Sequence, residues 1–493
     1  MKDDIDPQPS PGRLFLTVYP SIMLPMFLAV VDQTIVATAL PAIAASLGGV
    51  ERVSWIIVSY LVAGTIAAPV YGQLRDVYGG KRMMFVALGI FLVASLLCTV
   101  ATSVEMLCLA RVLQGLGGGG LMTLSQALIG ETIPPRERAR YQGYLAAVMV
   151  SSSVFGPVAG GYLTHHFGWR SVFLINLPLG AMAAILMLRL PSRPAREQPW
   201  TFDSMGLVLF VGFIVPALLA LEQAQRVSAS TLPTMLVLAA IAVAALVALV
   251  YREKRAPFPL LPINLLRQAT IWRSDALAAC HGATLVALVS FLPLYLRVVR
   301  GSSASETGLL LLPLMFGIGA GSMITGRSVS RTGLTAIFPS VGLVFATLAL
   351  VVFALWADSL SGWPLATFLF VVGLCMGTVM GVVQVTVQNA AGPGSLGSAA
   401  ASVQLSRSIG AAAGTALVGA VLFASLAVSD LDAAAAFRSL VERGPAAIAD
   451  LSADRRVLLQ SEISSAFRAA FLTISAFAAI GIALAWSIPA RRL

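Results

Sequence analysis

The stretch that decides the fold reads Leu28-Ala-Val-Val-Asp32-Gln-Thr-Ile-Val-Ala-Thr-Ala-Leu-Pro41, in which one acid interrupts a long apolar run. At about 1.5 Å per residue, Asp32 lies roughly 13 Å along a helix from Pro41. An ionisable side chain at that depth in a bilayer is costly and usually belongs to an ion or substrate pathway. The alternative is a structural acid satisfied by Gln33, Thr34 or a neighbouring helix. Asp32 is therefore a candidate proton-binding residue.

The composition around this stretch is that of a membrane protein. Apolar residues make up 58% of the 493 residues and charged residues 11%. Apolar runs of about 18 to 25 residues recur along the chain, as bilayer-spanning helices require. We therefore predict an all-α integral membrane protein with about fourteen spans. The expected spans are 14–41, 53–73, 83–102, 105–130, 142–164, 172–190, 203–222, 231–251, 274–296, 305–326, 334–356, 364–388, 398–427 and 466–488.

The net charge of +10 is explained by topology and not by nucleic-acid binding. With a cytoplasmic amino end, the predicted cytoplasmic segments hold twenty basic residues, and the short segments on the opposite side hold five. Basic residues in short loops mark the cytoplasmic side. The pattern predicts a multi-pass protein of the cell membrane, inner or plasma, with both termini in the cytoplasm.

A charged, proline-containing stretch divides the predicted spans into two groups of six. The expected organisation is a cytoplasmic amino terminus (1–13), an N-terminal six-helix bundle (14–190), a linker with two extra transmembrane helices (191–273), a C-terminal six-helix bundle (274–488) that contains a long outer loop (429–465), and a cytoplasmic carboxyl terminus (489–493). A weak internal repeat supports two halves, since Gly72-x-x-x-Asp76 and Gly326-Arg327 both follow a span. An ordinary positive cytoplasmic turn is the alternative explanation of that repeat.

Five motifs then follow one another along the chain. They are Asp32 to Pro41, Gly72-Gln-Leu-Arg-Asp76-Val-Tyr-Gly79-Gly-Lys81-Arg82, Leu109-Ala-Arg111-Val-Leu-Gln114-Gly115, Ser151-Ser-Ser-Val-Phe-Gly156-Pro157-Val-Ala-Gly160-Gly161 and Trp169-Arg-Ser-Val-Phe-Leu-Ile-Asn176-Leu-Pro178. Together they resemble the major facilitator superfamily, and within it the fourteen-span drug:proton antiporter family of multidrug exporters. The resemblance implies the major facilitator fold, with two six-helix bundles and two extra central helices.

The resemblance assigns proton coupling to Asp32 and Arg111. Gln114 lies on the same helix face as Arg111, three residues later. A guanidinium keeps its proton, so Arg111 would stabilise the proton-released state of a nearby acid. The alternative is that Arg111 reaches the outer interface or bonds backbone carbonyls. Gln114 and Arg407 are further candidates for substrate binding or coupling.

Two other motifs imply moving parts. A conformational latch is expected from Gly72, Asp76, Gly79, Lys81 and Arg82. Its acid would pair with the cations or with the positive end of a facing helix, although Val77 stands where the family usually has a basic residue, and a plain topology signal is the alternative. A hinge linked to antiport is expected from Gly156, Pro157, Gly160 and Gly161, where static packing of small residues is the alternative.

These features predict a proton-coupled multidrug efflux transporter, a drug/H⁺ antiporter with a role in antibiotic resistance. Its partners would be the lipid bilayer, protons and small lipophilic substrates, cationic or neutral, without a cofactor. In a host with two membranes, the family also includes members that use a periplasmic adaptor and an outer-membrane channel. The alternatives are a transporter of an endogenous lipid, siderophore or metabolite, and an integral-membrane enzyme. The sequence shows no metal-binding or nucleophilic constellation, which argues against an enzyme.

Overall fold

The computed structural model describes residues 18–48, 52–190, 201–224, 231–261, 263–357, 360, 362–429, 436–437, 439–440 and 453–492. The predicted amino terminus (1–13) and much of the predicted outer loop (429–465) lie outside these residues. The described chain is helical, and one isolated antiparallel bridge joins Leu334 and Arg492.

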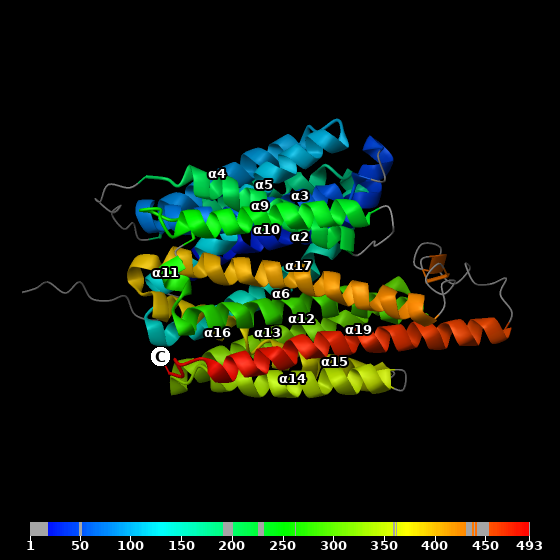
Figure 1. Ribbon diagram of the computed structural model, residues 1–493. Coiled ribbons are helices and arrows are strands. Elements are labelled where there is room, and N and C mark those ends of the chain that lie inside the picture. The colour runs from blue at the N-terminus through cyan, green and yellow to red at the C-terminus, as the bar shows by residue number, and fades with distance from the viewer. Residues whose placement is uncertain are drawn as a thin grey trace, which may run out of the picture. The chain divides into compact units, whose positions relative to one another are not determined.

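The helices follow the apolar runs of the sequence (Figure 1). The first part of the chain forms α2 (Tyr19–Leu47), α3 (Trp55–Tyr78), α4 (Gly80–Thr99), α5 (Val104–Thr132), α6 (Pro135–Phe167), α7 (Ser171–Leu174) and α8 (Asn176–Met187). The remainder forms α9 (Ser204–Ala224), α10 (Leu232–Glu253), α11 (Ile263–Leu266), α12 (Ala269–Val298), α13 (Ala304–Thr332), α14 (Ile337–Trp356), α15 (Gly362–Met376), α16 (Met380–Ala391), the 3-10 turn η3 (Pro393–Ser395), α17 (Leu396–Ser429) and α19 (Ala453–Ser487).

Thirteen helical segments of the described residues are long and apolar enough to cross a membrane. A shorter apolar segment, Ser171–Met187, occupies the place of the sixth predicted span and is divided into α7 and α8. The chain is therefore an all-α, multi-pass membrane protein, as predicted, and the count of fourteen spans stays a prediction. The last helix differs from expectation, because α19 begins at Ala453, inside the segment predicted to be loop.

Local signals set several helix ends. The Ser103 hydroxyl accepts a hydrogen bond from the Met106 amide at 3.1 Å and caps α5. Ser303 and Glu306 form a capping box at the start of α13. Gly79 has φ of 87° between α3 and α4, a conformation that side chains other than glycine rarely adopt. These ends fix where the helices emerge from their apolar spans.

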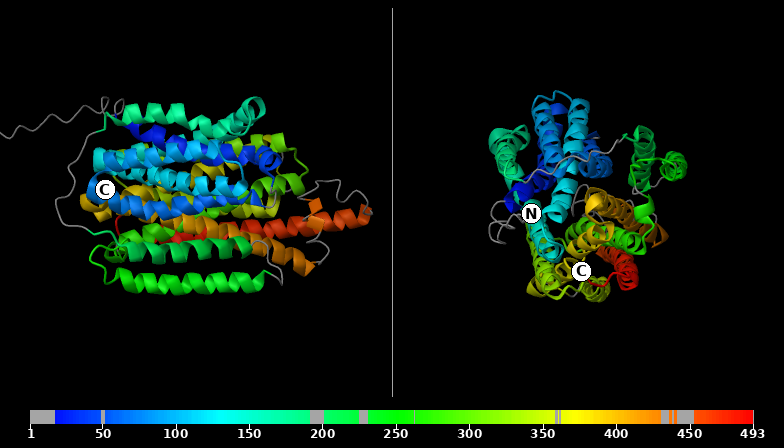
Figure 2. Two further views of the ribbon diagram at one scale, coloured as in Figure 1. Left: turned by 90° about the horizontal axis from the view of Figure 1, so that it is seen from above. Right: turned by 90° about the vertical axis from the view of Figure 1, so that its left-hand side faces the viewer.

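The chain divides into two compact units. The first contains the described residues of Met1–Pro134, Ser151–Thr201 and Pro393–Ala401, and the second contains those of Pro135–Val150, Phe202–Gly392 and Ser402–Leu493. In the first unit, α5 packs against α2, α3 and α4. In the second, α12 and α14 pack against α19, α13 packs against α15, and α9 pairs with α10 (Figures 1 and 2).

Glycines allow α5 to sit among its neighbours. A Cβ at Gly119 would collide with the backbone of Gly64 on α3, and one at Gly117 would meet the backbone of Phe91 on α4. Lipid gives no hydrophobic driving force for membrane helices to associate, so their association depends on close packing. Small residues allow that close packing. The run Gly117–Gly120 is therefore a packing surface of the first unit.

Candidate functional site

Asp32 lies on α2, inside the first unit, with 0% of its surface exposed. Its carboxylate accepts hydrogen bonds from side chains of two other helices. Gln114 Nε2 on α5 and Asn176 Nδ2 on α8 lie 2.8 and 2.9 Å from Oδ1, and Arg111 Nη1 is paired with Oδ2. All these partners are donors, so the arrangement fits the ionised form of Asp32.

Arg111, on α5, is also fully buried. Its Nη1 donates to Gln114 Oε1 at 2.7 Å, and its Nε donates to the carbonyl oxygen of Ile56 at 3.2 Å. The guanidinium carbon lies 4.1 Å from the centroid of the Tyr60 ring, within the range of a cation–π contact. Arg111 therefore stays inside the helix bundle, where it bonds both the acid and a backbone carbonyl. The structure brings Asp32, Arg111 and Gln114 together.

Two further residues complete this network, and neither had an expected role. The Ser95 hydroxyl on α4 accepts from Gln114 Nε2 at 2.9 Å and Asn176 Nδ2 at 3.2 Å, and donates to the carbonyl of Phe91 at 2.8 Å. The sequence feature that could have pointed to Asn176 is its place in the motif Trp169 to Pro178. Ser95 gave none, because a lone serine in a helix usually bonds only its own backbone.

Asp76, near the end of α3, binds the start of α17 within the first unit. Its Oδ1 accepts from the Gly397 amide at 2.9 Å, and its Oδ2 accepts from the Ser398 amide and hydroxyl at 3.1 and 3.0 Å. Arg75 bridges Asp76 at 2.7 Å and Glu131 at 2.6 Å. A carboxylate at a helix N-terminus satisfies free amides and faces the positive end of the dipole. Of the two expected pairings of Asp76, the structure has the one with the positive end of a facing helix, and the latch itself stays a prediction.

The other expected pairing of Asp76, with Lys81 and Arg82, is absent among the contacts of the described residues, because both cations have other partners. Lys81 Nζ donates to the carbonyl oxygens of Leu188 and Leu190, at 2.8 and 2.7 Å, just beyond α8. The Arg82 guanidinium lies 5.8 Å from the Tyr78 ring centroid. Carbonyls after a helix lack intrahelical partners and attract cations. Lys81 therefore ties α4 to the end of α8.

The latch glycines have separate reasons to be glycine. A Cβ at Gly72 would lie 2.7 Å from the carbonyl oxygen of Gly397 and 2.9 Å from the Ala401 Cβ. Such distances are too short for ordinary packing, so α3 and the start of α17 can approach this closely only without a side chain there. Gly79 supplies the positive φ that ends α3.

Asp76→Asn should loosen the start of α17. Asparagine keeps one acceptor oxygen, but its amide nitrogen would face the backbone donors of Gly397 or Ser398. Hydrogen bonds to charged groups contribute about 1.5–3 kcal/mol, so we expect at least about a tenfold loss of hydrogen-exchange protection at the Gly397 amide. Lys81→Gln is the matched control, and protection of Gly397 should survive it. Protection lost in the control but kept in Asp76→Asn would contradict the assignment.

Two glycines of the expected hinge pack α6 against α2, the helix that carries Asp32. A Cβ at Gly156 would collide with the Thr34 hydroxyl, and one at Gly160 would collide with the Thr38 hydroxyl. The two glycines are buried and lie four residues apart on one helix face. This face of α6 therefore packs closely against α2, the helix that carries Asp32.

The other predicted residues lie apart from these contacts. Pro157 and Gly161 are exposed on α6, and a Cβ at Gly161 would meet nothing within 4 Å. Arg407, on α17, donates from Nη2 to Gln404 Oε1 at 3.0 Å, and its backbone lies against Gly282 of α12. The structure thus places Arg407 in the second unit and the Asp32 network in the first.

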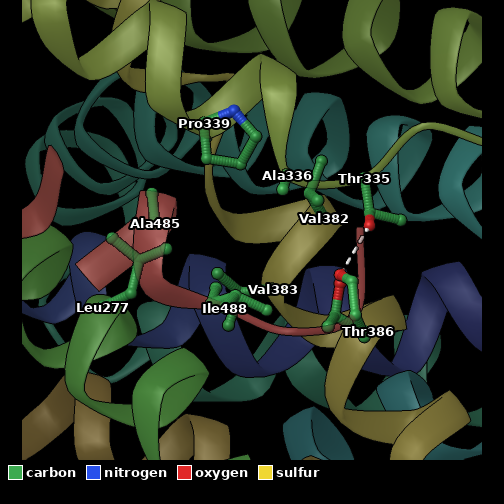
Figure 3. A pocket seen from close by; sticks show the side chains of 10 residues that line it. Leu277, Thr335, Ala336, Pro339, Val382, Val383, Thr386, Ala485 and Ile488 are labelled. Atoms are coloured by element: carbon green, nitrogen blue, oxygen red, sulfur yellow. Dashed lines mark hydrogen bonds between the residues drawn. The ribbon is translucent and has the colours of Figure 1, made fainter. Parts of the chain in front are cut away.

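The second unit also contains an apolar pocket (Figure 3). It lies among Leu277 of α12, Pro339 of α14 and Ile488, which follows α19. At its edge, the Thr335 hydroxyl donates to the carbonyl oxygen of Ala490 at 3.1 Å. Within the part of the chain that the structure describes, no predicted site residue lines this pocket.

Solved structures share this fold. The human organic anion transporter MFSD10 (TETRAN) superposes with a TM-score of 0.65 at 14% sequence identity, covering 97% of this chain and 100% of that one. The proton:xylose symporter XylE superposes with a TM-score of 0.60 at 13% identity, covering 97% and 96%. At these identities the likeness shows the fold alone, which agrees with the predicted fold class.

Sequence comparison identifies the family. The family model of the Major Facilitator Superfamily matches residues 22–415. The multidrug transporter protein MdtP of Bacillus subtilis is 32% identical over 401 residues, which cover 81% of this chain and 74% of that protein. Multidrug resistance protein 3 of the same organism is 30% identical, covering 81% and 78%. The chain therefore belongs to the Major Facilitator Superfamily and is a membrane transporter, not an enzyme.

Proposed function

We propose that this transporter is a proton-coupled exporter of lipophilic compounds, cationic or neutral, that works by alternating access. The observation that carries the proposal is the buried carboxylate of Asp32, held by donors that include Arg111. Protonation would remove the negative charge and break the ion pair, so the network has two states that a proton can select. Relatives named as a multidrug transporter and a multidrug resistance protein support export and the substrate class.

The remaining predicted parts take roles in the same cycle. Residues 14–190 and 274–488 would form the two six-helix bundles, with two extra helices carried by 191–273. The contact of Asp76 with the start of α17 would hold one conformation, and the Gly156 and Gly160 face of α6 would serve as the hinge. The protein would lie in the cell membrane with both termini in the cytoplasm.

The proton gradient is adequate for this work. For a neutral substrate, one elementary charge crossing about 100 mV releases roughly 2.3 kcal/mol, enough for about a fifty-fold concentration ratio before any pH difference is counted. One-for-one exchange with a monovalent cation moves no net charge and is driven by the pH difference. No further energy source is required by the proposal.

A reconstituted system tests the proposal directly. Proteoliposomes with an acidic lumen, and with the membrane potential clamped near zero by valinomycin and equal potassium on both sides, should accumulate a permanently charged lipophilic fluorescent cation, and a protonophore should stop the accumulation. A permanently charged dye is chosen because weak bases follow a pH gradient without any protein. Protein-free vesicles are the control. Accumulation that ignores the gradient would refute proton coupling, and failure across a panel of such dyes would refute drug export.

A second candidate is the transport of an endogenous lipid, siderophore or metabolite that carries an acidic group. Arg407 favours it, because its guanidinium has five donors and makes one hydrogen bond among the described residues, to Gln404. The same vesicles, loaded with a panel of lipophilic carboxylates, separate the two candidates. Transport of carboxylates that Arg407→Gln abolishes, without transport of the cations, would support this candidate.

A further inference from the structure

The helices α9 and α10 form a pair (Figure 1). Two acidic residues lie at one end of this pair. Asp203 immediately precedes α9, and Glu253 is the last residue of α10. Their exposed fractions are 5% and 3%. Burying two carboxylates is costly unless each of them is paired or loses its charge.

Each carboxylate has one bonded oxygen and one unbonded oxygen. Asp203 Oδ1 accepts from the Gly206 amide at 2.9 Å and from Arg252 Nη2 at 3.2 Å. Glu253 Oε2 accepts from the Leu261 amide at 3.2 Å. Asp203 Oδ2 and Glu253 Oε1 are buried and have no hydrogen-bond partner among the residues that the structure describes. Such orphaned buried acceptors are uncommon and require an explanation.

The two unbonded oxygens face the same point. A Cβ built on Gly206 would lie 2.7 Å from Asp203 Oδ2 and 2.9 Å from Glu253 Oε1. Both oxygens therefore lie under 3.0 Å from a single position. The absence of a side chain at Gly206 leaves room for the two acids to approach each other.

Among the residues that the structure describes, the local charges do not balance when both acids are ionised. Arg252 contributes one positive charge, paired with Asp203. The charged neighbours that act on Glu253 are Asp203 and Arg252, and the backbone amides of Leu261 and Leu260 also act on it. Lys254 is exposed, and the Arg255 guanidinium lies 3.8 Å from the Tyr251 ring centroid. Two carboxylates that share a buried site cannot both ionise readily.

We propose that Asp203 and Glu253 form a second proton-binding site, in which one shared proton bridges Asp203 Oδ2 and Glu253 Oε1 and closes the end of the α9–α10 pair. The proton turns one orphaned acceptor into a donor for the other, so both are satisfied at once. Through the Leu261 amide, the closed pair also fixes the segment that follows α10. Loss of the proton leaves two facing negative charges and opens this end.

The proposed site predicts that the end of the α9–α10 pair opens more easily as pH rises. The closed pair holds one proton that the two separated carboxylates release near neutral pH, so opening releases a proton and becomes easier as pH rises. We expect the hydrogen-exchange protection of the Gly206 and Leu261 amides, measured relative to the intrinsic exchange rate, to fall at least about tenfold between acidic and alkaline pH.

Variants of the whole 493-residue chain in nanodiscs test whether the shared proton causes the pH dependence of amide protection. In Glu253→Gln the amide nitrogen donates to Asp203 Oδ2 at every pH, so protection should no longer change with pH. Asp203→Asn should remove the dependence in the same way and serves if the first variant does not fold. Glu105→Gln is the matched control, since Glu105 is exposed and paired with Arg52. The control should keep the parental pH dependence.

Infrared difference spectra give an independent readout. The parent should show the carbonyl stretch of protonated carboxylic acid that disappears on alkalinisation. The part of this band that belongs to the Asp203–Glu253 pair should be missing from Glu253→Gln and present in Asp32→Asn. Protection that follows the concentration of sodium or calcium at fixed pH would overturn the proposal in favour of a metal site. Protection in the parent that is independent of pH would also overturn it. Asp32→Asn should leave the pH dependence of the Gly206 and Leu261 protection unchanged, so failure of the transport proposal is distinguishable.

Discussion

Asp32→Asn should reduce the gradient-driven accumulation of dye to the level of protein-free vesicles. An asparagine neither takes up nor releases a proton, so the two-state pair with Arg111 is lost. Its side-chain oxygen can still accept from Gln114 and Asn176, but its amide nitrogen would face the guanidinium, donor against donor. The measurement is the initial rate of accumulation under an imposed gradient, normalised to the amount of reconstituted protein.

Controls must separate lost coupling from lost folding. The single variant leaves Arg111 buried without its counter-charge, which costs about 3–5 kcal/mol in comparable cases. The double variant Asp32→Asn with Arg111→Gln removes both charges and should recover much of the melting temperature while staying inactive. Asp275→Asn, which alters another buried acid, hydrogen-bonded to Ser402 at 3.3 Å, should keep parental transport. Parental transport by the double variant would show that the proton site lies elsewhere.

Gly119→Val is expected to have the largest effect on folding. The new side chain would be driven into the backbone of Gly64, where α3 and α5 cross, and backbone cannot move aside as a flexible side chain does. Overpacking a well-packed core typically costs about 1–3 kcal/mol, and a backbone collision lies at or above the upper end. Thermal unfolding of the purified protein in detergent, together with its yield in the membrane fraction, measures the loss.

Gly89→Val is the matched control for that substitution. Gly89 is an exposed helical glycine of α4, and a Cβ there would meet nothing within 4 Å. Its melting temperature should stay within a few degrees of the parental value, since surface substitutions away from special features usually change stability by about 0.5 kcal/mol or less. Equal destabilisation by both variants would mean that β-branching itself, and not the helix crossing, causes the loss.

The fold was largely predictable because bilayer thickness imposes a length on every apolar run. The helices therefore coincide with the apolar runs, and most differences between predicted and observed helices lie at the helix ends. Residues 453–465 fall in the predicted long outer loop, for which a short amphipathic helix is one of the open interpretations, and in the structure they form the first part of α19. Charged residues indicate which segments lie outside the bilayer. A helix can extend beyond the bilayer, so composition alone does not locate its first residue.

The site was predictable where charge marked it and hidden where it did not. Asp32 and Arg111 stand out because ions are rare inside membrane helices. Ser95 and Asn176 carry no charge. Packing of α8 against α2 brings Asn176 to the carboxylate, and packing of α4 against α5 and α8 brings Ser95 to Gln114 and Asn176. The latch shows the same limit, since the partner of Asp76 is a backbone terminus far along the chain. No side-chain pattern in the sequence specifies such a partner.

The neutrality of the Asp32–Arg111 pair has an electrical consequence. In the described arrangement the two charges cancel, and a proton on Asp32 leaves the positive charge of Arg111 uncompensated. A cycle that exchanges one proton for one monovalent cation would then carry no current, whereas exchange for a neutral compound would move one charge across the membrane. Export of cations would follow the pH difference alone, and export of neutral compounds would also respond to voltage.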